Sequence, residues 1–155
     1  MMQFSLEDLL PHRPPMVLID EVESFDFEKK RLVARVTIGE NQLFFDGKGV
    51  PNWVAIEYMA QTAAALVGYY DRHVAPGQPV RPGLLLGTRK LDLKLERFEA
   101  GKTYRIVAEN AFSDSDAASF VCRIEDDTGE TVATANLNAY RPPDMEQFLK
   151  EQVKE

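Results

Sequence analysis

The chain has 155 residues, of which 45% are apolar and 28% are charged, and this composition is typical of one compact globular domain. There are 18 basic and 25 acidic residues, giving a net charge of −7, so a general nucleic-acid surface is not expected, because phosphate binding needs a basic field. The single cysteine, Cys122, excludes an internal disulfide, and two histidines argue against a zinc site. No metal or cofactor is implied.

The sequence does not predict a signal peptide or a membrane span. The N-terminal residues include Glu7 and Asp8 and lack a basic-then-apolar run. The stretch 53–70 is apolar but contains Glu57 and Gln61, whereas a spanning helix needs about 20 apolar residues and disfavours a central carboxylate. We therefore expect a buried helix of a soluble, cytoplasmic protein.

The first expected elements are a short helix and two strands. Ser5 suits the N-cap of a helix over 5–10, with Asp8 three positions further on. After a proline-rich stretch, residues 16–24 are expected to form a strand. Residues 31–38 alternate more clearly between apolar and polar. The apolar face of this strand comprises Leu32, Ala34, Val36 and Ile38.

A long helix is expected from Asn52 to about Arg72. Asn52 suits the N-cap because it follows Pro51 and precedes an apolar run. Arg72 and His73 suit the negative end of the helix dipole, where we expect His73 to be solvated. The helix also has small residues that permit close approach to a sheet. They are Ala60, Ala63, Ala64, Ala65 and Gly68.

After an expected loop over 76–82, four strands follow. The first has alternating leucines over 91–96, and the last two are joined by a hairpin turn over 126–129. Two strands, one long helix and four strands predict an α+β fold, in which a single antiparallel six-stranded sheet wraps around one central helix. We expect one domain over 1–155, with a core over about 9–140 and an amphipathic tail helix over about 144–154.

Glu57 is the strongest candidate for a chemical role. An ionised carboxylate on an otherwise apolar helix is disfavoured unless it has a partner, and a carboxylate in such surroundings can act as a general acid or base. Gln61 follows one turn later on the same face and can orient it. The alternative is a structural carboxylate that is bonded across an interface.

Other candidates have weaker patterns. The backbone N–H groups of Asn52 and Trp53 can stabilise a developing oxyanion, although an ordinary capped helix explains them as well. His12 lies between prolines and is either a proton-transfer partner or a packing residue. Cys122 alternates inward with apolar neighbours and is expected to be an inert core thiol.

Basic residues gather after the long helix, which in an acidic protein suggests a contact for an acidic carrier or a phosphate. The candidate carrier-binding residues are Arg81, Arg89 and Arg97. Lys90 and Lys94 accompany them, but their alternation with acids is equally typical of a solvated strand face.

Two segments resemble a known family. The run Leu10-Pro11-His12-Arg13-Pro14-Pro15-Met16, followed by Leu18-Ile19-Asp20, resembles the opening of the β-hydroxyacyl-acyl carrier protein dehydratases of the hotdog fold. The run Pro51-Asn52-Trp53-Val54-Ala55-Ile56-Glu57-Tyr58-Met59-Ala60-Gln61 resembles their central helix, and Phe44-Phe45 before a glycine also fits. The resemblance spans about 9–140. The short loop and the Gly-Val-Pro-Asn-Trp run are similar to a divergent branch associated with aryl-polyene biosynthesis.

By this resemblance, Glu57 matches the helix carboxylate of the family. In the family it works with a histidine from a Gly-His-Phe-Pro loop, contributed across a dimer interface. The corresponding loop here, residues 44–51, is shorter and has no histidine. His12 matches a position that is not normally the catalytic base, so its assignment as the imidazole partner is our inference, and we expect it to lie close to Glu57.

The leading hypothesis is a dehydratase that acts on a 3-hydroxyacyl group linked to acyl carrier protein or coenzyme A. An acyl tunnel would be lined by Phe44, Phe45, Tyr58 and Leu86. The alternatives are a thioesterase in which Glu57 activates water, and a non-catalytic acyl-binding partner subunit. A homodimer or higher homo-oligomer is expected, because one sheet around one helix leaves an exposed edge and an open tunnel.

Overall fold

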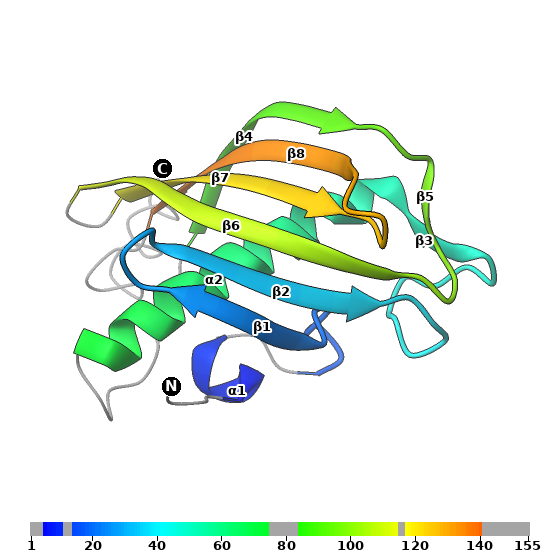
Figure 1. Ribbon diagram of the computed structural model, residues 1–155, viewed down its shortest axis with the longest axis horizontal. Coiled ribbons are helices and arrows are strands. Elements are labelled where there is room, and N and C mark those ends of the chain that lie inside the picture. Colours follow the sequence, from blue (N-terminus) through cyan, green and yellow to red (C-terminus); the bar gives the residue numbers. More distant parts are fainter. Residues whose placement is uncertain (1–4, 11–13, 75–83, 115–116, 141–155) are drawn as a thin grey trace, which may run out of the picture.

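The computed structural model describes residues 5–10, 14–74, 84–114 and 117–140. Its main sheet has six antiparallel strands in the order β1-β2-β6-β7-β8-β4 and curves around the helix α2 (Figure 1). The strands are β1 (Glu21–Asp26), β2 (Arg31–Thr37), β4 (Leu84–Leu93), β6 (Thr103–Asp114), β7 (Ala117–Glu125) and β8 (Thr131–Tyr140). The hotdog fold expected from the sequence is confirmed.

Three helical segments lie in the described part of the chain. They are α1 (Leu6–Leu9), the 3-10 helix η1 (Asn52–Val54) and α2 (Ala55–Val74). The expected cap of α1 is present, because Ser5 Oγ accepts from Asp8 N and Asp8 Oδ2 accepts from Ser5 N. The helix η1 runs directly into α2, so together they form the long helix that the sequence predicts.

The core lies between α2 and the concave face of the sheet. The predicted face of β2 is buried there, since Leu32, Ala34 and Val36 are each 0% exposed. Val33 and Val107, which pair with each other on the opposite face, are buried as well, at 7% and 2% exposed. From α2, Tyr58, Met59 and Ala65 are also 0% exposed. The alternation in sequence therefore identified which side of each strand faces the helix.

The first predicted strand is wrong in its position. We expected a strand over 16–24, but β1 covers Glu21–Asp26, and 16–20 belongs to no strand. The backbone N–H and C=O of Leu18 bond to the side chains of Gln61 and Gln42, at 2.8 and 3.2 Å. Because these side chains pair with Leu18 in place of a neighbouring strand, the ladder with β2 begins only after it, where Asp20 N donates to the carbonyl of Arg35 at 2.9 Å.

The predicted N-cap of the long helix is also wrong. Pro51 occupies the cap position, and the side chain of Asn52 donates to the carbonyl of Leu95 at 3.0 Å. An additional two-stranded sheet, which the sequence did not predict, pairs β3 (Gly49–Pro51) with β5 (Arg97–Glu99). This small sheet and the Asn52 bond attach the beginning of the helix to the chain that follows β4.

The first strand after the helix differs from the prediction over 91–96. Strand β4 starts earlier and ends at Leu93, and its pairing with β8 is interrupted by a bulge between Arg89 and Asp92. Lys90 has a φ of 54° in this bulge, and Leu91 is 42% exposed. A bulge changes the side-chain alternation, which is why the leucine pattern misplaced the strand. The hairpin turn is confirmed, since Gly129, with a φ of 88°, lies between β7 and β8.

Parts of the chain lie outside the described residues, including the expected loop over 76–82 and the expected tail helix over 144–154. Among the described residues, the structure has no helix that is long and apolar enough to cross a membrane.

Gly68 packs against α1, and not against the sheet as its small size had suggested. A Cβ atom at Gly68 would lie 2.2 Å from the carbonyl oxygen of Leu9. The absence of a side chain therefore permits α1 to contact α2.

We expect Gly68→Ala to destabilise the protein by about 2 kcal/mol, because the clash with Leu9 backbone outweighs the gain of about 1 kcal/mol in helix propensity. Urea unfolding measures the change. Gly87→Ala is the matched control, because its Cβ would meet nothing within 4 Å. Equal stability of the two variants would contradict the close packing of α1 on α2.

Candidate active site

Glu57 lies in the first turn of α2 and is partly buried. Gln61, one turn further along, donates a hydrogen bond from Nε2 to Glu57 Oε1 at 3.1 Å. The contact that the helical spacing predicted is therefore present. A carboxylate that accepts from a fixed amide has a defined direction for its remaining lone pairs, which a general acid or base requires.

Gln61 is itself held in one orientation. Its side chain is 0% exposed, Oε1 accepts from Leu18 N at 2.8 Å, and Nε2 also donates to the carbonyl of Met16 at 2.7 Å. Because a backbone N–H can only donate and a carbonyl can only accept, these partners determine which end of the amide faces Glu57. The donor to the carboxylate is therefore fixed by the backbone.

Aromatic and apolar side chains surround the start of the helix. Trp53 is 56% exposed, and its ring lies edge-on to that of Phe44 with the centroids 5.1 Å apart. Phe45, the next residue in the sequence after Phe44, is partly buried, and Leu43 is 43% exposed. Trp53 lies one helical turn before Glu57, so apolar side chains are exposed next to the turn that carries the carboxylate, which suits a substrate with an acyl chain.

The loop before the helix is shaped by Asp46. Its Oδ1 accepts from Lys48 N and Gly49 N, both at 3.0 Å, and its Oδ2 pairs with Arg97 at 2.9 Å. The hydrogen bond from Lys48 N, followed by the bonds from Arg97 and Gly49, lowers the pKa of Asp46 from its ordinary value. Arg97, which we had assigned to carrier binding, therefore has a structural partner in this loop.

Tyr58 lies in the core and not at the surface. Its side chain is 0% exposed, its ring lies edge-on to Phe98 at 5.3 Å, and its hydroxyl donates to Gln42 Oε1 at 2.9 Å. Burial raises the pKa of Tyr58. Packing and this hydrogen bond account for Tyr58, so we withdraw it from the residues proposed to line an acyl tunnel.

Several predicted site residues lie outside what the structure describes, namely His12, Arg81 and the side chain of Leu86. His73 is at the other end of α2, with its ring 4.6 Å from that of Phe27. At a helical rise of about 1.5 Å per residue, His73 lies about 24 Å from Glu57 along the helix axis. Burial raises the pKa of Cys122 to about 12, as expected for an inert thiol in the core.

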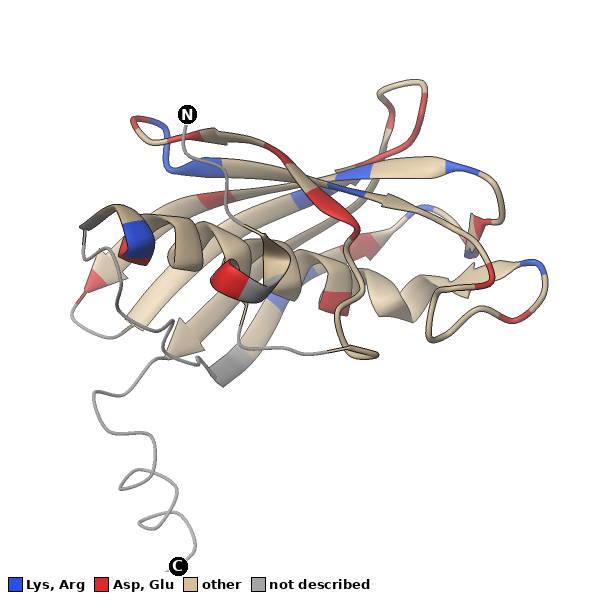
Figure 2. Ribbon diagram, turned by 90° about the horizontal axis from the view of Figure 1, so that it is seen from below, with Lys and Arg blue, Asp and Glu red and all other residues tan. Residues whose placement is uncertain are grey.

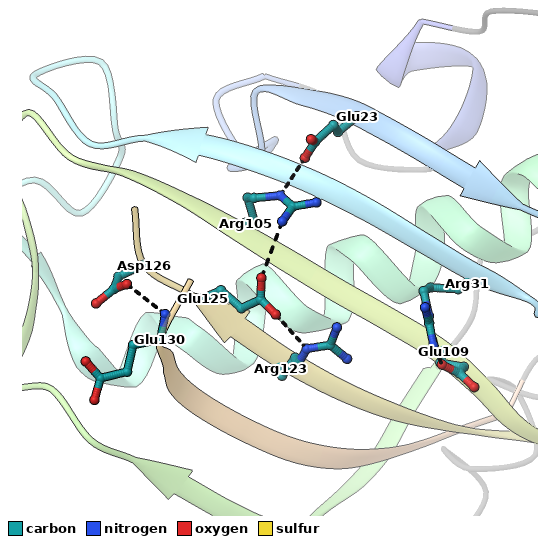
Figure 3. A network of polar contacts seen from close by, with 8 residues as sticks. All are labelled: Glu23, Arg31, Arg105, Glu109, Arg123, Glu125, Asp126 and Glu130. Carbon is teal, nitrogen blue, oxygen red and sulfur yellow. Dashed lines mark hydrogen bonds and ion pairs between the residues drawn. The ribbon is translucent and has the colours of Figure 1, made fainter. Parts of the chain in front are cut away.

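The convex face of the sheet carries a network of ion pairs (Figure 3). Arg105 contacts Glu23 at 2.8 Å and Glu125 at 3.4 Å, and Glu125 also contacts Arg123 at 2.9 Å. A shallow groove on this face is lined by these arginines together with Phe25 and Phe27. Its arginines are already paired with carboxylates, so the groove is a poor site for an anionic ligand. Charges are spread over strands and loops, whereas α2 is mostly uncharged (Figure 2).

Comparison with known proteins identifies the family. The family described as ApeP-like, ApeP dehydratase, matches residues 4–150. The chain belongs to the ApeP-like dehydratase family. It is a hotdog dehydratase, and the 3-hydroxyacyl thioester dehydratase-like function expected from the sequence is confirmed.

Relatives of this ApeP-like dehydratase agree with the assignment. It is 30% identical to the 3-hydroxyacyl-[acyl-carrier-protein] dehydratase FabZ of Chlamydia trachomatis over 134 residues, covering 70% of this chain and 87% of the relative. A chain in the solved dehydratase heterocomplex ApeI:P from Xenorhabdus doucetiae matches with a TM-score of 0.86 and 26% identity, covering 99% of this chain and 100% of that one. A hypothetical thioesterase from Streptococcus pneumoniae, solved with coenzyme A, matches with a TM-score of 0.59, 12% identity, and coverage of 79% and 84%. That likeness shows the fold alone.

Sequence analysis of the ApeP-like chain did not identify two residues that shape the site, Gln42 and Asp46. Gln42 is 7% exposed although it lies in a loop with no periodicity, so no pattern indicated its burial. Asp46 stands before a glycine, which is a common turn signal, and this signal could have indicated its bonds to Lys48 N and Gly49 N.

Proposed function

We propose that this ApeP-like chain dehydrates 3-hydroxyacyl groups carried on acyl carrier protein, with Glu57 as the proton-transferring group. The observation that carries the proposal is the partly buried carboxylate in the first turn of α2, held by an amide whose orientation the backbone determines. Relatives named as acyl-carrier-protein dehydratases support the carrier, and we propose the cytoplasm as the compartment.

The reaction removes a proton from C2 and the hydroxyl from C3. A base takes the C2 proton, the electron pair of that C–H bond forms the C2–C3 double bond, and an acid protonates the departing hydroxyl, which leaves as water. We propose that the carboxylate of Glu57 takes part in this transfer while Gln61 keeps its direction fixed.

The thioester oxygen gains negative charge when C2 loses its proton. The first N–H groups of a helix lack intrahelical partners, and we propose that those of Asn52 and Trp53 stabilise this charge. Asn52 would act through its backbone, since its side chain is bonded to Leu95. Phe44, Phe45 and Trp53 would flank the acyl group, with Leu86 from β4 as a further lining residue.

We propose His12 as the imidazole partner of Glu57. The loop over 44–51 has no histidine, and His73 is at the far end of α2. The bond from Gln61 to the Met16 carbonyl at 2.7 Å holds the chain after His12 against the helix, and four residues reach at most about 14 Å. This tether is compatible with an imidazole beside Glu57.

We propose that the site works within an assembly of hotdog subunits. Strand β4 is at one edge of the sheet. The exposed side of the helix around Glu57 is apolar, with Trp53 exposed and Ile56, Ala60 and Ala64 partly exposed. The ApeI:P neighbour is a heterocomplex, which favours pairing with a second, different hotdog subunit over the homodimer expected from the sequence.

We propose the bulge of β4 as the contact for the acidic carrier. Arg89 and Lys90 are exposed there, as is Lys94 just after the strand, in contrast to the paired Arg97. The carbonyl of Leu95, next to Lys94, accepts from Asn52, so this end of the patch adjoins the start of the helix. Arg81 remains a further candidate.

We expect Glu57→Gln to lower kcat for dehydration by about 100-fold or more, because the amide keeps the shape and removes proton transfer. Enoyl product is measured by mass spectrometry, which also distinguishes dehydration from hydrolysis to free acid and from binding without turnover. The matched control is Asp71→Asn, which removes another carboxylate of α2 and should retain activity. Loss of folding in Glu57→Gln would instead show that the carboxylate is structural.

We expect His12→Gln to lower kcat by a similar factor in the isolated chain. Light scattering on the same sample tests whether that chain is a dimer. The variant is then assayed after co-expression with a hotdog dehydratase of the same organism. Restored activity in that complex would reject His12 as the proton donor and assign the histidine to the second subunit.

We expect Lys90→Glu combined with Lys94→Glu to raise KM for carrier-linked substrate by about threefold to tenfold, because repulsion weakens encounter with an acidic partner. KM for the coenzyme A thioester should change less. Lys29→Glu is the control, since Lys29 lies in the exposed turn after β1, near the far end of α2. If Lys29→Glu raised KM equally, the effect would come from the net charge of the protein and not from a local contact.

A further inference from the structure

The backbone of Leu18 is enclosed by two glutamine side chains. Its N–H donates to Gln61 Oε1 at 2.8 Å, and its C=O accepts from Gln42 Nε2 at 3.2 Å. In a sheet, such N–H and C=O groups are paired by a neighbouring strand. Here they are paired by residues from the central helix and from the loop before it, so one buried peptide segment joins both.

The same contacts continue to Tyr58 at one end and to Glu57 at the other. The Tyr58 hydroxyl donates to Gln42 Oε1 at 2.9 Å, and Gln61 Nε2 donates to Glu57 Oε1 at 3.1 Å. Tyr58 and Gln61 are 0% exposed, Leu18 is 2% exposed and Gln42 is 7% exposed. A continuous, water-excluded series of hydrogen bonds thus leads from a core hydroxyl to the candidate catalytic carboxylate.

The direction of every bond in this series is determined by Leu18. Its carbonyl can only accept, so the amide nitrogen of Gln42 must face it, and the oxygen of Gln42 must face Tyr58. Its N–H can only donate, so the oxygen of Gln61 must face it, and the nitrogen of Gln61 is left for Glu57. Neither amide can flip without leaving buried groups unpaired, which is costly in a low-dielectric interior.

We propose that Gln42 and Tyr58 are positioning residues of the dehydratase, which act through Leu18 and Gln61 to hold the Glu57 carboxylate in its reactive orientation. This inference rests on the proposed role of Glu57. The ring of Tyr58 packs on Phe98 as a phenylalanine would. The hydroxyl adds nothing to that packing, and its function is to orient Gln42.

The test uses Tyr58→Phe and Gln42→Met, with Tyr104→Phe as the matched control. Tyr104 is also a buried tyrosine on Phe98, with the centroids 5.0 Å apart, and its hydroxyl accepts from Glu99 N at 3.0 Å, outside the series. We expect kcat to fall about fivefold in Tyr58→Phe and Gln42→Met, with KM within about twofold, since a misaligned carboxylate affects the chemical step more than binding. Tyr104→Phe should keep kcat within about twofold at a similar loss of thermal stability.

A double-mutant cycle with Gln61→Met gives a readout that a purely structural role would not change. If Tyr58 acts through Gln61, Tyr58→Phe has no further effect on kcat once Gln61 is replaced. The inference would be overturned if the kcat losses of the two single variants multiplied in the double variant, or if Tyr104→Phe lowered kcat as much as Tyr58→Phe. If Tyr58→Phe does not fold, Gln42→Met gives the same comparison.

The Glu57→Gln variant separates this inference from the function on which it rests. An inactive Glu57→Gln together with Tyr58→Phe that behaves like Tyr104→Phe rejects the positioning series alone. An active Glu57→Gln rejects the proposed site and the positioning series with it.

Discussion

The requirement that the buried amide of Gln61 be fully paired is the constraint on which the site depends. A side-chain amide with no access to water must find partners for its oxygen and its nitrogen, or it destabilises the fold by about 1–3 kcal/mol. Gln61 finds them in the backbone of Met16 and Leu18 and in Glu57. One side chain therefore attaches the N-terminal segment to the helix and also fixes the direction of the carboxylate.

The surface of the protein differs in charge from one region to another. The convex face of the sheet is covered by paired arginines and carboxylates, and the loop before the helix uses Arg97 for its own geometry. Arg89 and Lys90 in β4 and Lys94 just after it are exposed, and so is the side chain of Trp53, one helical turn before Glu57. These two regions are the ones to which we assign the acyl group and the carrier in the proposed reaction.

Much of the fold follows from short-range patterns in the sequence. Alternation in β2 identified its buried face, and apolar continuity identified the helix that contains Glu57 and Gln61. These predictions succeeded because strand and helix periods relate neighbours within one element. Prediction failed where a contact replaced a local preference. Asn52 was expected to cap the helix, yet it bonds to Leu95, and the bulge at Lys90 displaced the leucine alternation of β4.

The sequence by itself determined the hotdog architecture, the position of the central helix and the pairing of Glu57 with Gln61 one turn away. Only the tertiary structure decided that Gln61 is locked by Leu18, 43 residues away, and that Arg97 belongs to Asp46, 51 residues away. It also showed that Tyr58, which the sequence offered as a tunnel residue, is fully buried with Gln42 as its hydrogen-bond partner. The reason is physical: periodicity reports whether a side chain is buried, whereas the identity of its hydrogen-bond partner depends on which distant segments the fold brings together.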